Sequence, residues 1–567
     1  MNHSLSSVHP PSWQALYPQG LGPDLSPEHG TALQLFETAV AARPAHPAMW
    51  YFNRSLSYSE VAAAADALAS FWSHAGVRRG DRVFAILQNC PEFLISMIAT
   101  WKLGAIPVPA NPMYRRGELA RLFADAEPVA IVCETDHQPE VQAAFAALGT
   151  QLPTVLTTYP ESFRGNAAAV DVGTFAKAIE DWRDHSPGAA PPAPDDLGLL
   201  LYTSGTTGAP KGAMIHHSSL ASNGQLVRDW CSLGRDTRVL GIAPFFHITG
   251  LVCHLLAAMS ARATVVAHYR FDPEVVLDVV RQTRPTFTIG AITAFNALMN
   301  APGAMPDDFA SFERVYSGGA PIPPALVEKL RTALGIVIHT SYGMTETTAP
   351  THLAPFGREI PIDPASGALS IGVPVPSTEA MVVDDGGREL SPGEVGELLV
   401  RGPQVMAGYW RKAEESATAL RGGWMHTGDV GFRDSAGWFY LVDRKKDVII
   451  ASGFKVWPRE VEDALYAHPA VREAAVVGTP DSYRGETVKA VVSFKPGAQA
   501  TEAELITHCR SLLAAYKVPR GVQVLPGLPM TATGKIQRMA VREIAAKGIP
   551  STHLTDRGLR SSTPKSG

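Results

Sequence analysis

A stretch rich in hydroxyl and glycine residues, from Thr203 to Gly212, follows a short hydrophobic run. Backbone N–H groups and side-chain hydroxyls in such a loop can converge on phosphate oxygens, and Lys211 adds a positive charge. The stretch differs from the common nucleotide loop G-x-x-x-x-G-K-[ST], because Pro210 stands at the second glycine and Gly212 follows the lysine. Pro210 has no N–H to donate, so we do not expect a phosphate cradle at a helix N-terminus. A flexible loop without a ligand is the alternative.

A second polar segment runs from residue 341 to residue 347, with the sequence SYGMTET. Tyr342 and Gly343 offer a flat ring beside open backbone, which suits the face of an adenine base. Thr345 can bond a phosphate, and Glu346 is a hard oxygen ligand of the kind that Mg²⁺ prefers. A solvated surface charge is an equally good explanation of Glu346 at this point, since most glutamates are exposed.

Two further segments each present one charged residue beside a glycine. Asp429 ends the string GWMHTGD, where a carboxylate on a tight glycine turn can accept hydrogen bonds from both hydroxyls of a ribose. A simple Asx turn is the alternative. Lys535 follows Gly534 in the string TATGKIQR, and an exposed lysine in such a turn ordinarily has no chemical role.

The combination is more specific than any one segment. The strings YTSGTTGAPKG, SGGAPIP, SYGMTETT, HTGDVG, DRKKDVIIASGFKVWPREVE and TATGKIQR occur in this order. Together they closely resemble the acyl-adenylate-forming superfamily, which comprises acyl- and aryl-CoA synthetases, firefly-type luciferases and the adenylation domains of peptide synthetases. The resemblance extends over about residues 30 to 540.

The resemblance implies a site for ATP and AMP. The first loop would hold the β- and γ-phosphates, Thr345 the α-phosphate and Glu346 the Mg²⁺ ion that accompanies ATP. Asp429 would bind the ribose, and Arg444 would help to hold the ribose and phosphate. The full set of implied ATP and AMP residues is Thr203, Ser204, Gly205, Thr206, Thr207, Gly208, Lys211, Gly319, Ala320, Pro321, Ser341, Tyr342, Gly343, Thr345, Asp429, Arg444 and Lys535.

The resemblance assigns the central catalytic role to Lys535, with Lys211, Thr345 and Glu346 beside it. The lysine would bridge the substrate carboxylate and the α-phosphate. A cation between two anions offsets their repulsion and orients an in-line attack. A compact ammonium on a long stem suits this task better than a guanidinium.

Transfer to coenzyme A requires a second arrangement, because the lysine turn would block the thiol. The resemblance implies that a small mobile C-terminal domain rotates about a hinge at 444–446, with Lys446 as the hinge residue. Gly453 and Phe454 would then replace the lysine turn. A short charged run between two domains can absorb the backbone change that such a rotation needs.

The acyl pocket is implied to involve His247, Gly318, Gly319 and Gly343. The three glycines are expected to leave open volume, and the neighbouring Phe245, Phe246, Ile248 and Ala291 are apolar, so we expect a hydrophobic acid, fatty or aromatic. A lone histidine in an apolar run is often a packed core residue, which is the alternative for His247. Two residues depart from the family pattern. Thr340 stands where relatives often have an amide side chain that bonds the adenine. Ile450 stands where luciferase-like members have a second lysine, so light emission is not supported.

The helices and strands expected around these residues indicate a multidomain α/β protein. Hydrophobic runs, such as the strands expected at 81–87 and 286–290, alternate with helical patterns, such as the helix expected at 91–103, up to about Gly343. This alternation indicates parallel sheets covered on both faces. Shorter runs between Ile371 and Gly408 indicate a small antiparallel sheet or barrel, and the last 120 or so residues an α+β domain. We therefore expect a large N-terminal domain at 1–443, the hinge at 444–446, a small domain at 447–550 and a disordered tail at 551–567.

The composition of the chain limits which binding partners are expected. The net charge of −5 gives no basic field for nucleic acid, and the five scattered cysteines indicate reduced thiols of a cytoplasmic protein. No signal peptide or stretch of roughly 20 apolar residues is evident, so we expect no integral membrane segment. A homodimer is left open.

The sequence therefore predicts an ATP-dependent acyl-CoA synthetase that forms an acyl-adenylate, releases pyrophosphate and passes the acyl group to coenzyme A. A ligase that loads a carrier protein in trans is the alternative within the same chemistry. A catalytically dead nucleotide-binding protein is the alternative from another class, but it would have lost Lys535 or Glu346, and both are present.

Overall fold

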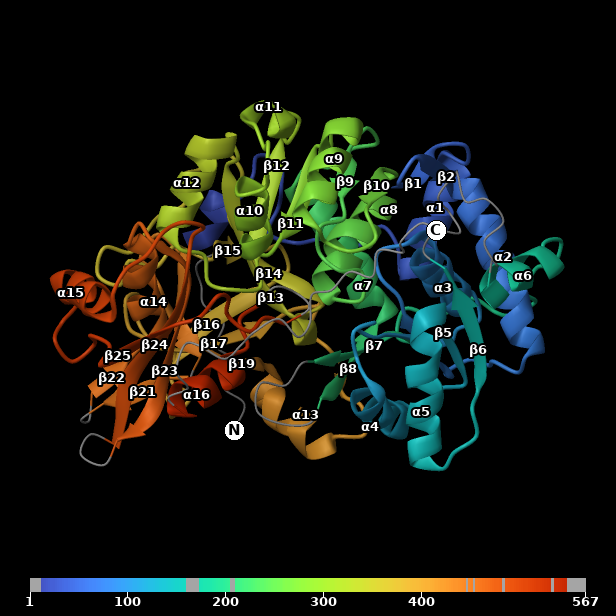
Figure 1. The fold of residues 1–567 in the computed structure, drawn as a ribbon. Coiled ribbons are helices and arrows are strands. Elements are labelled where there is room, and N and C mark those ends of the chain that lie inside the picture. Colours follow the sequence, from blue (N-terminus) through green and yellow to red (C-terminus); the bar gives the residue numbers. More distant parts are fainter. Residues whose placement is uncertain are drawn as a thin grey trace. The chain divides into compact units, whose positions relative to one another are not determined.

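The computed structural model describes residues 12–159, 173–203, 210–444, 447–451, 454–481, 485–531 and 535–547 (Figure 1). They form two compact units. The first takes in the described residues up to Asp363, Ala368–Leu441 and Lys535. The second holds Pro364–Gly367 and the described residues of 442–531 and from 536 onward. Lys446 of the expected hinge and the whole expected tail, 551–567, lie outside the described residues.

A nine-stranded sheet is the largest part of the first unit. Its central strands, from β13 to β1, run parallel, while β14, β15 and β2 pair antiparallel at the two edges. In sheet order the strands are β15 (Val373–Pro374), β14 (Ala349–Leu353), β13 (Ile338–Met344), β12 (Arg314–Gly318), β11 (Phe287–Gly290), β9 (Arg238–Leu240), β10 (Thr264–Ala267), β1 (Pro47–Tyr51) and β2 (Arg54–Ser57).

Helices cover both faces of this sheet. On one face α9 (Pro273–Thr283), α10 (Ile292–Met299) and α12 (Pro324–Leu334) share a hydrophobic core with Val315 and Ile338 of the strands. Tyr316 points to the other face, where its hydroxyl and the indole Nε1 of Trp230 in α7 (His217–Trp230) both donate to the carbonyl of Ala354. The prediction of a parallel sheet covered on both faces is confirmed. The remaining helices of this part are η1 (Ser12–Leu16), α1 (Ala32–Ala42), η4 (Gly250–Leu256), α8 (Ala257–Ala261) and α11 (Pro306–Phe309).

A four-stranded parallel sheet lies at the N-terminal side of the first unit. Its order is β4 (Ile106–Pro109), β3 (Arg82–Ile86), β5 (Ala130–Glu134) and β6 (Thr154–Thr158). The strand expected at 81–87 and the helix expected at 91–103 are present as β3 and α3 (Pro91–Lys102). The other helices are α2 (Tyr58–His74), α4 (Arg116–Ala126), η2 (Thr135–His137), α5 (Gln138–Leu148) and α6 (Gly173–Asp181).

Two antiparallel sheets complete the first unit. One joins β18 (Gly408–Tyr409), β8 (Lys211–His216) and β7 (Leu197–Thr203). The other joins β16 (Glu379–Val383), β17 (Gly396–Arg401), β19 (Met425–Arg433) and β20 (Phe439–Arg444), and the first unit ends within β20, at Leu441. The expected small antiparallel sheet is therefore present, and it extends beyond Gly408 because β19 and β20 belong to it. The short helices here are η5 (Thr345–Thr347), α13 (Ala413–Ala419) and η6 (Arg421–Gly423).

The second unit is an α+β domain, as expected. Its sheet has the order β22 (Phe454–Val456), β21 (Ile449–Ala451), β24 (Gly485–Phe494) and β23 (Val471–Asp481), with β25 (Gly521–Val524) parallel to β24. Ala474 and Val476 of β23 face a core shared with α14 (Pro458–Ala467) and α15 (Glu502–Leu512). Ala475 and Val477 face a second core that includes α16 (Arg538–Lys547). This period of two is the pattern of a sheet covered on both sides.

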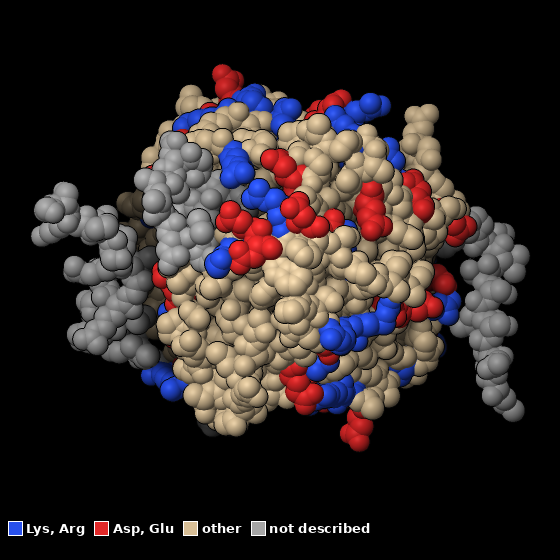
Figure 2. All heavy atoms as spheres, turned by 90° about the vertical axis from the view of Figure 1, so that its right-hand side faces the viewer, with Lys and Arg blue, Asp and Glu red and all other residues tan. Residues whose placement is uncertain are grey.

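The described surface carries mixed charge. Figure 2 shows acidic and basic side chains interleaved in small groups on the face that it presents. All five cysteines are buried and free, which agrees with the expectation of reduced thiols. In the part of the chain that the structure describes, no helix has both the length and the apolar character needed to cross a membrane.

Candidate active site

The hydroxyl- and glycine-rich stretch connects two antiparallel strands. Thr203 ends β7 and pairs with Lys211, the first residue of β8. Helix α7 begins only at His217, after β8, so the stretch leads into a strand and not into a helix N-terminus, in agreement with the expectation from Pro210. Five of the implied ATP residues lie between the strands and outside the described residues: Ser204, Gly205, Thr206, Thr207 and Gly208.

Thr345 and Glu346 lie in a single 3₁₀ turn, η5, between β13 and β14. Asn223 of α7 holds this turn, because its side-chain amide donates to the carbonyl of Thr348. Thr348 has φ 53°, a left-handed conformation that β-branched residues rarely adopt, so the turn is strained and needs such support. Glu346 is 8% exposed, which excludes the alternative of a solvated surface charge. Nothing in the sequence pointed to Asn223.

The structure brings Glu346 and Lys211 to one side chain, that of Tyr409 in β18. The tyrosine hydroxyl donates to Oε1 of Glu346 at 2.8 Å, and Nζ of Lys211 lies 5.0 Å from the centre of the ring. β18 pairs with β8, so the two strands that carry Tyr409 and Lys211 are neighbours in one sheet. Tyr409 was not among the residues expected from the sequence, because the string Gly408-Tyr-Trp410 does not distinguish a functional tyrosine from a packed one.

Tyr342 and Asp429 form a second buried pair. The hydroxyl of Tyr342 donates to Oδ2 of Asp429 at 2.7 Å. The ring of His352 meets that of Tyr342 edge-on, with 5.6 Å between the ring centres. Burial lowers the pKa of His352 to about 3, so this ring is neutral at neutral pH. The adenine and ribose residues of the sequence prediction are therefore in direct contact with each other.

Asp429 does not lie in a tight turn, and that expectation is wrong. It lies within strand β19, at a bulge where the register to β17 shifts between Glu397 and Leu399. Gly428 has φ 69°, a conformation that glycine adopts at little cost. The amide of Asp429 donates to Oγ1 of Thr427 at 3.0 Å. Bulges of this kind redirect side chains and occur often beside active sites.

The expectation that three glycines leave open volume is wrong for two of them. A Cβ on Gly318 would lie 2.2 Å from the carbonyl oxygen of Ser341, and one on Gly343 would lie 2.2 Å from that of Ala349. These glycines permit close approach of neighbouring strands instead. Gly319 has φ 75°, and a Cβ there would lie 3.1 Å from Cε of Lys535.

Of the other residues in this segment, Ala320 is half-buried and Pro321 is exposed, and Ser341 is half-buried. Thr345 is half-buried as well. The adenine and phosphate contacts expected of these residues stay predictions.

His247 and Lys535 are both within the first unit. Burial lowers the pKa of the His247 imidazole to about 3, and the positive charge of Lys535 lowers it further. The His247 side chain is half-buried. By contrast, His254 in the π-helix η4 is fully buried and bonds the carbonyl of Ile289 through Nε2 at 2.9 Å. The alternative of a packed core histidine thus describes His254 better than His247.

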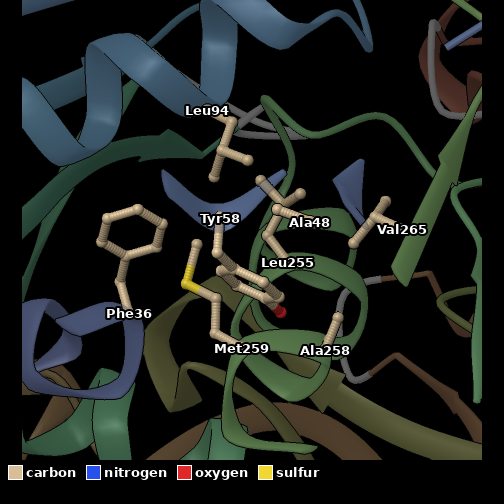
Figure 3. Close-up of a pocket in the computed structure, with 8 residues that line it drawn as sticks. All are labelled: Phe36, Ala48, Tyr58, Leu94, Leu255, Ala258, Met259 and Val265. Carbon is tan, nitrogen blue, oxygen red and sulfur yellow. The ribbon is translucent and has the colours of Figure 1, made fainter. Parts of the chain in front are cut away.

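A small cavity lies among buried apolar side chains, and none of the site residues lines it (Figure 3). The hydroxyl of Tyr58 is bonded to the carbonyl of Ala263 at 2.7 Å. An apolar cavity of this kind stays dry and offers no polar group to orient a substrate. Its lining residues are Phe36, Ala48, Tyr58, Leu94, Leu255, Ala258, Met259 and Val265.

The donor chemistry of Glu346 fits Mg²⁺. Its carboxylate is a hard oxygen ligand, and Mg²⁺ in nucleotide sites is usually held by one or two carboxylates together with substrate phosphates. Among the described residues, no group of three or more His, Cys, Asp or Glu side chains is arranged to hold a metal by itself. The fit is thus to an ion that arrives with ATP.

The residues expected to act in the second half-reaction are only partly described. Arg444 is the last residue of β20, and Phe454 is the first of β22. Lys446 and Gly453 lie outside the described residues. Their roles stay predictions.

The chain matches known protein families along most of its length. Residues 36–410 match the family described as AMP-binding enzyme, and residues 460–535 match the AMP-binding enzyme C-terminal domain. The chain is 35% identical over 553 residues to a long-chain-fatty-acid–CoA ligase of Bacillus subtilis (strain 168), with 94% of this chain and 97% of that protein covered. It is 37% identical over 499 residues to a feruloyl-CoA synthase of an Amycolatopsis species, with 88% and 96% covered.

The chain is also similar to solved structures over most of its length. ATP-bound MatB from Rhodopseudomonas palustris matches with a TM-score of 0.81 and 31% identity, covering 90% of this chain and 98% of that one. The anthranilate CoA ligase AuaEII in complex with anthranoyl-AMP matches with a TM-score of 0.82 and 28% identity, covering 91% and 97%. The relatives whose names state an activity are CoA ligases or CoA synthases, so the carrier-protein alternative is not favoured. The chain belongs to the AMP-binding enzyme family and is an AMP-forming acid–thiol ligase, an acyl-CoA synthetase that makes an acyl-adenylate from ATP and transfers the acyl group to coenzyme A.

Proposed function

We propose that this acyl-CoA synthetase acts on a hydrophobic carboxylic acid, fatty or aromatic, with Mg²⁺ supplied together with ATP. The observation that carries the nucleotide part is the meeting of Lys211 and Glu346 at one buried tyrosine, Tyr409. It brings a cation suited to phosphate and a carboxylate suited to a metal ion to the same side chain, although the two are far apart in sequence.

The preference for a hydrophobic acid rests on the surroundings of His247. Phe245, Phe246 and Ile248 are buried, and so is every residue of η4, which follows directly. His247 itself is neutral, because burial and the charge of Lys535 both disfavour its protonation. A neutral ring between buried apolar residues can line an apolar acyl group without adding charge. The relatives named for long-chain fatty acids, ferulate and anthranilate act on acids of this kind.

In the first half-reaction an oxygen of the substrate carboxylate attacks the α-phosphorus of ATP. A bond forms between that oxygen and phosphorus, and the bond to pyrophosphate breaks. Lys535 holds the attacking carboxylate beside the α-phosphate and offsets their charge repulsion. Thr203, Lys211 and the loop between them hold the leaving phosphates. Tyr342 and Asp429 hold the adenosine, and Mg²⁺ bound by Glu346 and the phosphates would neutralise phosphate charge.

In the second half-reaction the thiolate of coenzyme A attacks the acyl carbon, a C–S bond forms, and the C–O bond to AMP breaks. The proposal includes a rotation of the small domain, residues 447–550, about Lys446. Lys535 belongs to this stretch of chain, although its contacts place it with the first unit, so the rotation would remove it and present Gly453 and Phe454. The support for this step is the sequence resemblance. We also propose a cytoplasmic location, in keeping with five buried and free cysteines.

The experiment that tests the proposal is a panel of carboxylic acids assayed for AMP release with and without coenzyme A. The panel runs from acetate through medium and long fatty acids to benzoate and ferulate. Hydrophobic acids should give AMP release that depends on coenzyme A, and acetate should give little. Equal or greater activity with acetate would overturn the substrate class, and AMP release without any acid would overturn the reaction order.

A further inference from the structure

Tyr409 is the described side chain that links the two catalytic candidates at the phosphate end of the site. It lies in β18, a two-residue strand whose register to β8 is Gly408 opposite Met214 and Tyr409 opposite Ala213. Lys211 begins that same strand β8. The position of Tyr409 relative to Lys211 is therefore fixed by backbone pairing within one sheet.

Both contacts of Tyr409 are made in a largely buried setting. The side chains of Tyr409 and Glu346 are each 8% exposed, and the hydroxyl donates to Oε1 of Glu346 at 2.8 Å. Nζ of Lys211 stands 5.0 Å from the ring centre, which is within cation–π range. One side chain thus bonds the carboxylate and faces the ammonium.

Backbone bonds on both sides of Tyr409 keep it in place. Its own amide donates to Oγ of Ser416 at 2.8 Å, and the amide of Trp410 donates to the carbonyl of Gly212 at 2.7 Å. The amide of Met406 donates to the carbonyl of Glu346 at 2.8 Å. The strand is therefore tied both to the hairpin that carries Lys211 and to the turn that carries Glu346.

The chemistry of these contacts bears on metal binding. A carboxylate that ligates a metal is commonly oriented by a hydrogen bond from a neighbouring side chain, and loss of that bond costs about 10- to 100-fold in metal affinity. The hydroxyl of Tyr409 donates such a bond to Glu346, and the Tyr409 ring faces Lys211. Its ring also offers Lys211 a defined position near the strand end before a phosphate is bound.

We propose that Tyr409 is a positioning residue that orients the carboxylate of Glu346 and the ammonium of Lys211 for the Mg²⁺-bound phosphates of ATP. The proposal rests on the function proposed above. If Tyr409 acts in this way, removal of its hydroxyl should reduce the effect of Mg²⁺ on nucleotide binding and change binding without Mg²⁺ little. Removal of the hydroxyl from a tyrosine that only supports the fold would not produce this difference.

The test is calorimetric titration of the whole chain with α,β-methylene-ATP, with and without saturating Mg²⁺. The variant is Tyr409→Phe, which keeps the ring opposite Lys211 and removes only the hydroxyl. We expect the gain in affinity from Mg²⁺ to shrink by about 10- to 100-fold. The melting temperature should fall only slightly, because a single hydrogen bond to a carboxylate is lost. The matched control is Tyr440→Phe, which removes a hydroxyl bonded at 3.1 Å to Asp434, outside the site, and should behave as wild type.

A second variant separates orientation from packing. In Glu346→Gln the metal ligand itself is changed, so adding Tyr409→Phe should produce little further loss if the tyrosine acts through the glutamate. Additive losses in the double variant would overturn the proposal. So would an unchanged Mg²⁺ effect in Tyr409→Phe, or an equal loss of affinity with and without Mg²⁺. A wild-type chain that shows the Mg²⁺ effect yet turns over no acid would contradict the proposed function and leave the role of Tyr409 supported.

Discussion

The two ends of the proposed nucleotide site, the phosphate end at Glu346 and the nucleoside end at Asp429, are built alike but have different neighbouring groups. At the phosphate end Tyr409 donates to Glu346 at 2.8 Å, and at the nucleoside end Tyr342 donates to Asp429 at 2.7 Å. Both carboxylates are buried. The ammonium of Lys211 lies over the ring of Tyr409, whereas the neutral ring of His352 packs edge-on against Tyr342.

This difference matches the charge that each end must meet. Triphosphate and Mg²⁺ carry high charge, so a cation and an oriented carboxylate suit the phosphate end. An adenosine carries none, so a neutral aromatic setting suits the nucleoside end. The comparison therefore predicts that similar substitutions at the two ends will have different effects, with Lys535 acting where the two substrates meet.

The largest effect should come from Lys535→Ala. We expect adenylation, measured as pyrophosphate exchange, to fall by about 10²- to 10³-fold, because a charge that stabilises the transition state is lost. Thioester formation from supplied acyl-AMP should remain, since that step does not use the lysine. The control is Lys547→Ala, an exposed lysine of α16 whose side chain is paired with Glu543. Equal loss in both half-reactions would contradict this assignment.

Glu346→Gln should break the phosphate end alone. The amide keeps an oxygen that can accept from Tyr409 but loses the charge that attracts Mg²⁺. We expect the Mg²⁺ concentration for half-maximal pyrophosphate exchange to rise about 10- to 100-fold, with part of the rate recovered at high Mg²⁺. A magnesium titration identical to wild type would show that Glu346 is not the ligand.

Asp429→Asn should affect the nucleoside end alone. The charged acceptor for the ribose hydroxyls is lost, and a hydrogen bond to a charged group contributes about 1.5–3 kcal/mol, so KM for ATP should rise about 10- to 100-fold. The dependence on Mg²⁺ should stay that of wild type. If Asp429→Asn and Glu346→Gln change the magnesium titration alike, the two ends are not functionally distinct.

The smallest effect concerns acid stability of the nucleoside end. The pKa of His352 is lowered to about 3 in the folded chain, whereas an exposed histidine titrates near 6.5. The unfolded chain thus binds a proton first as pH falls below 6.5, which destabilises the folded state by about 1.4 kcal/mol at roughly pH 5.5. In His352→Phe the melting temperature should fall less between pH 7 and pH 5.5 than in wild type. Equal falls in the two proteins would assign the acid sensitivity to other groups.

The sequence was most informative about elements and segment order. Hydrophobic periodicity located β3, α3 and β11 to within a few residues, because buried strands and amphipathic helices leave a regular pattern. Pro210 argued against a phosphate cradle at a helix N-terminus for a purely local reason, the missing N–H. Both are properties of short stretches of chain, and so both are readable without the fold.

The site residues that could not be predicted from the sequence make contacts with residues far away along the chain. Tyr409 is 63 residues from Glu346, and Asn223 is 125 residues from Thr348. Such pairings follow from sheet order and not from a local string. The open volume expected at Gly318 and Gly343 was wrong for the same reason, since carbonyl oxygens of neighbouring strands fill the space. A glycine-rich string thus did not distinguish a pocket from a close backbone contact.

The central claim, attack of a carboxylate on the α-phosphorus followed by acyl transfer, is tested most directly with isotope. A hydrophobic acid found active in the panel is labelled with ¹⁸O at both carboxylate oxygens and incubated with ATP, Mg²⁺ and coenzyme A, and the AMP formed is analysed by mass spectrometry. The account predicts one ¹⁸O in each AMP, because the oxygen that attacks phosphorus stays with AMP when the C–O bond breaks. AMP without ¹⁸O, formed together with acyl-CoA, would contradict an acyl-adenylate and with it the role given to Lys535.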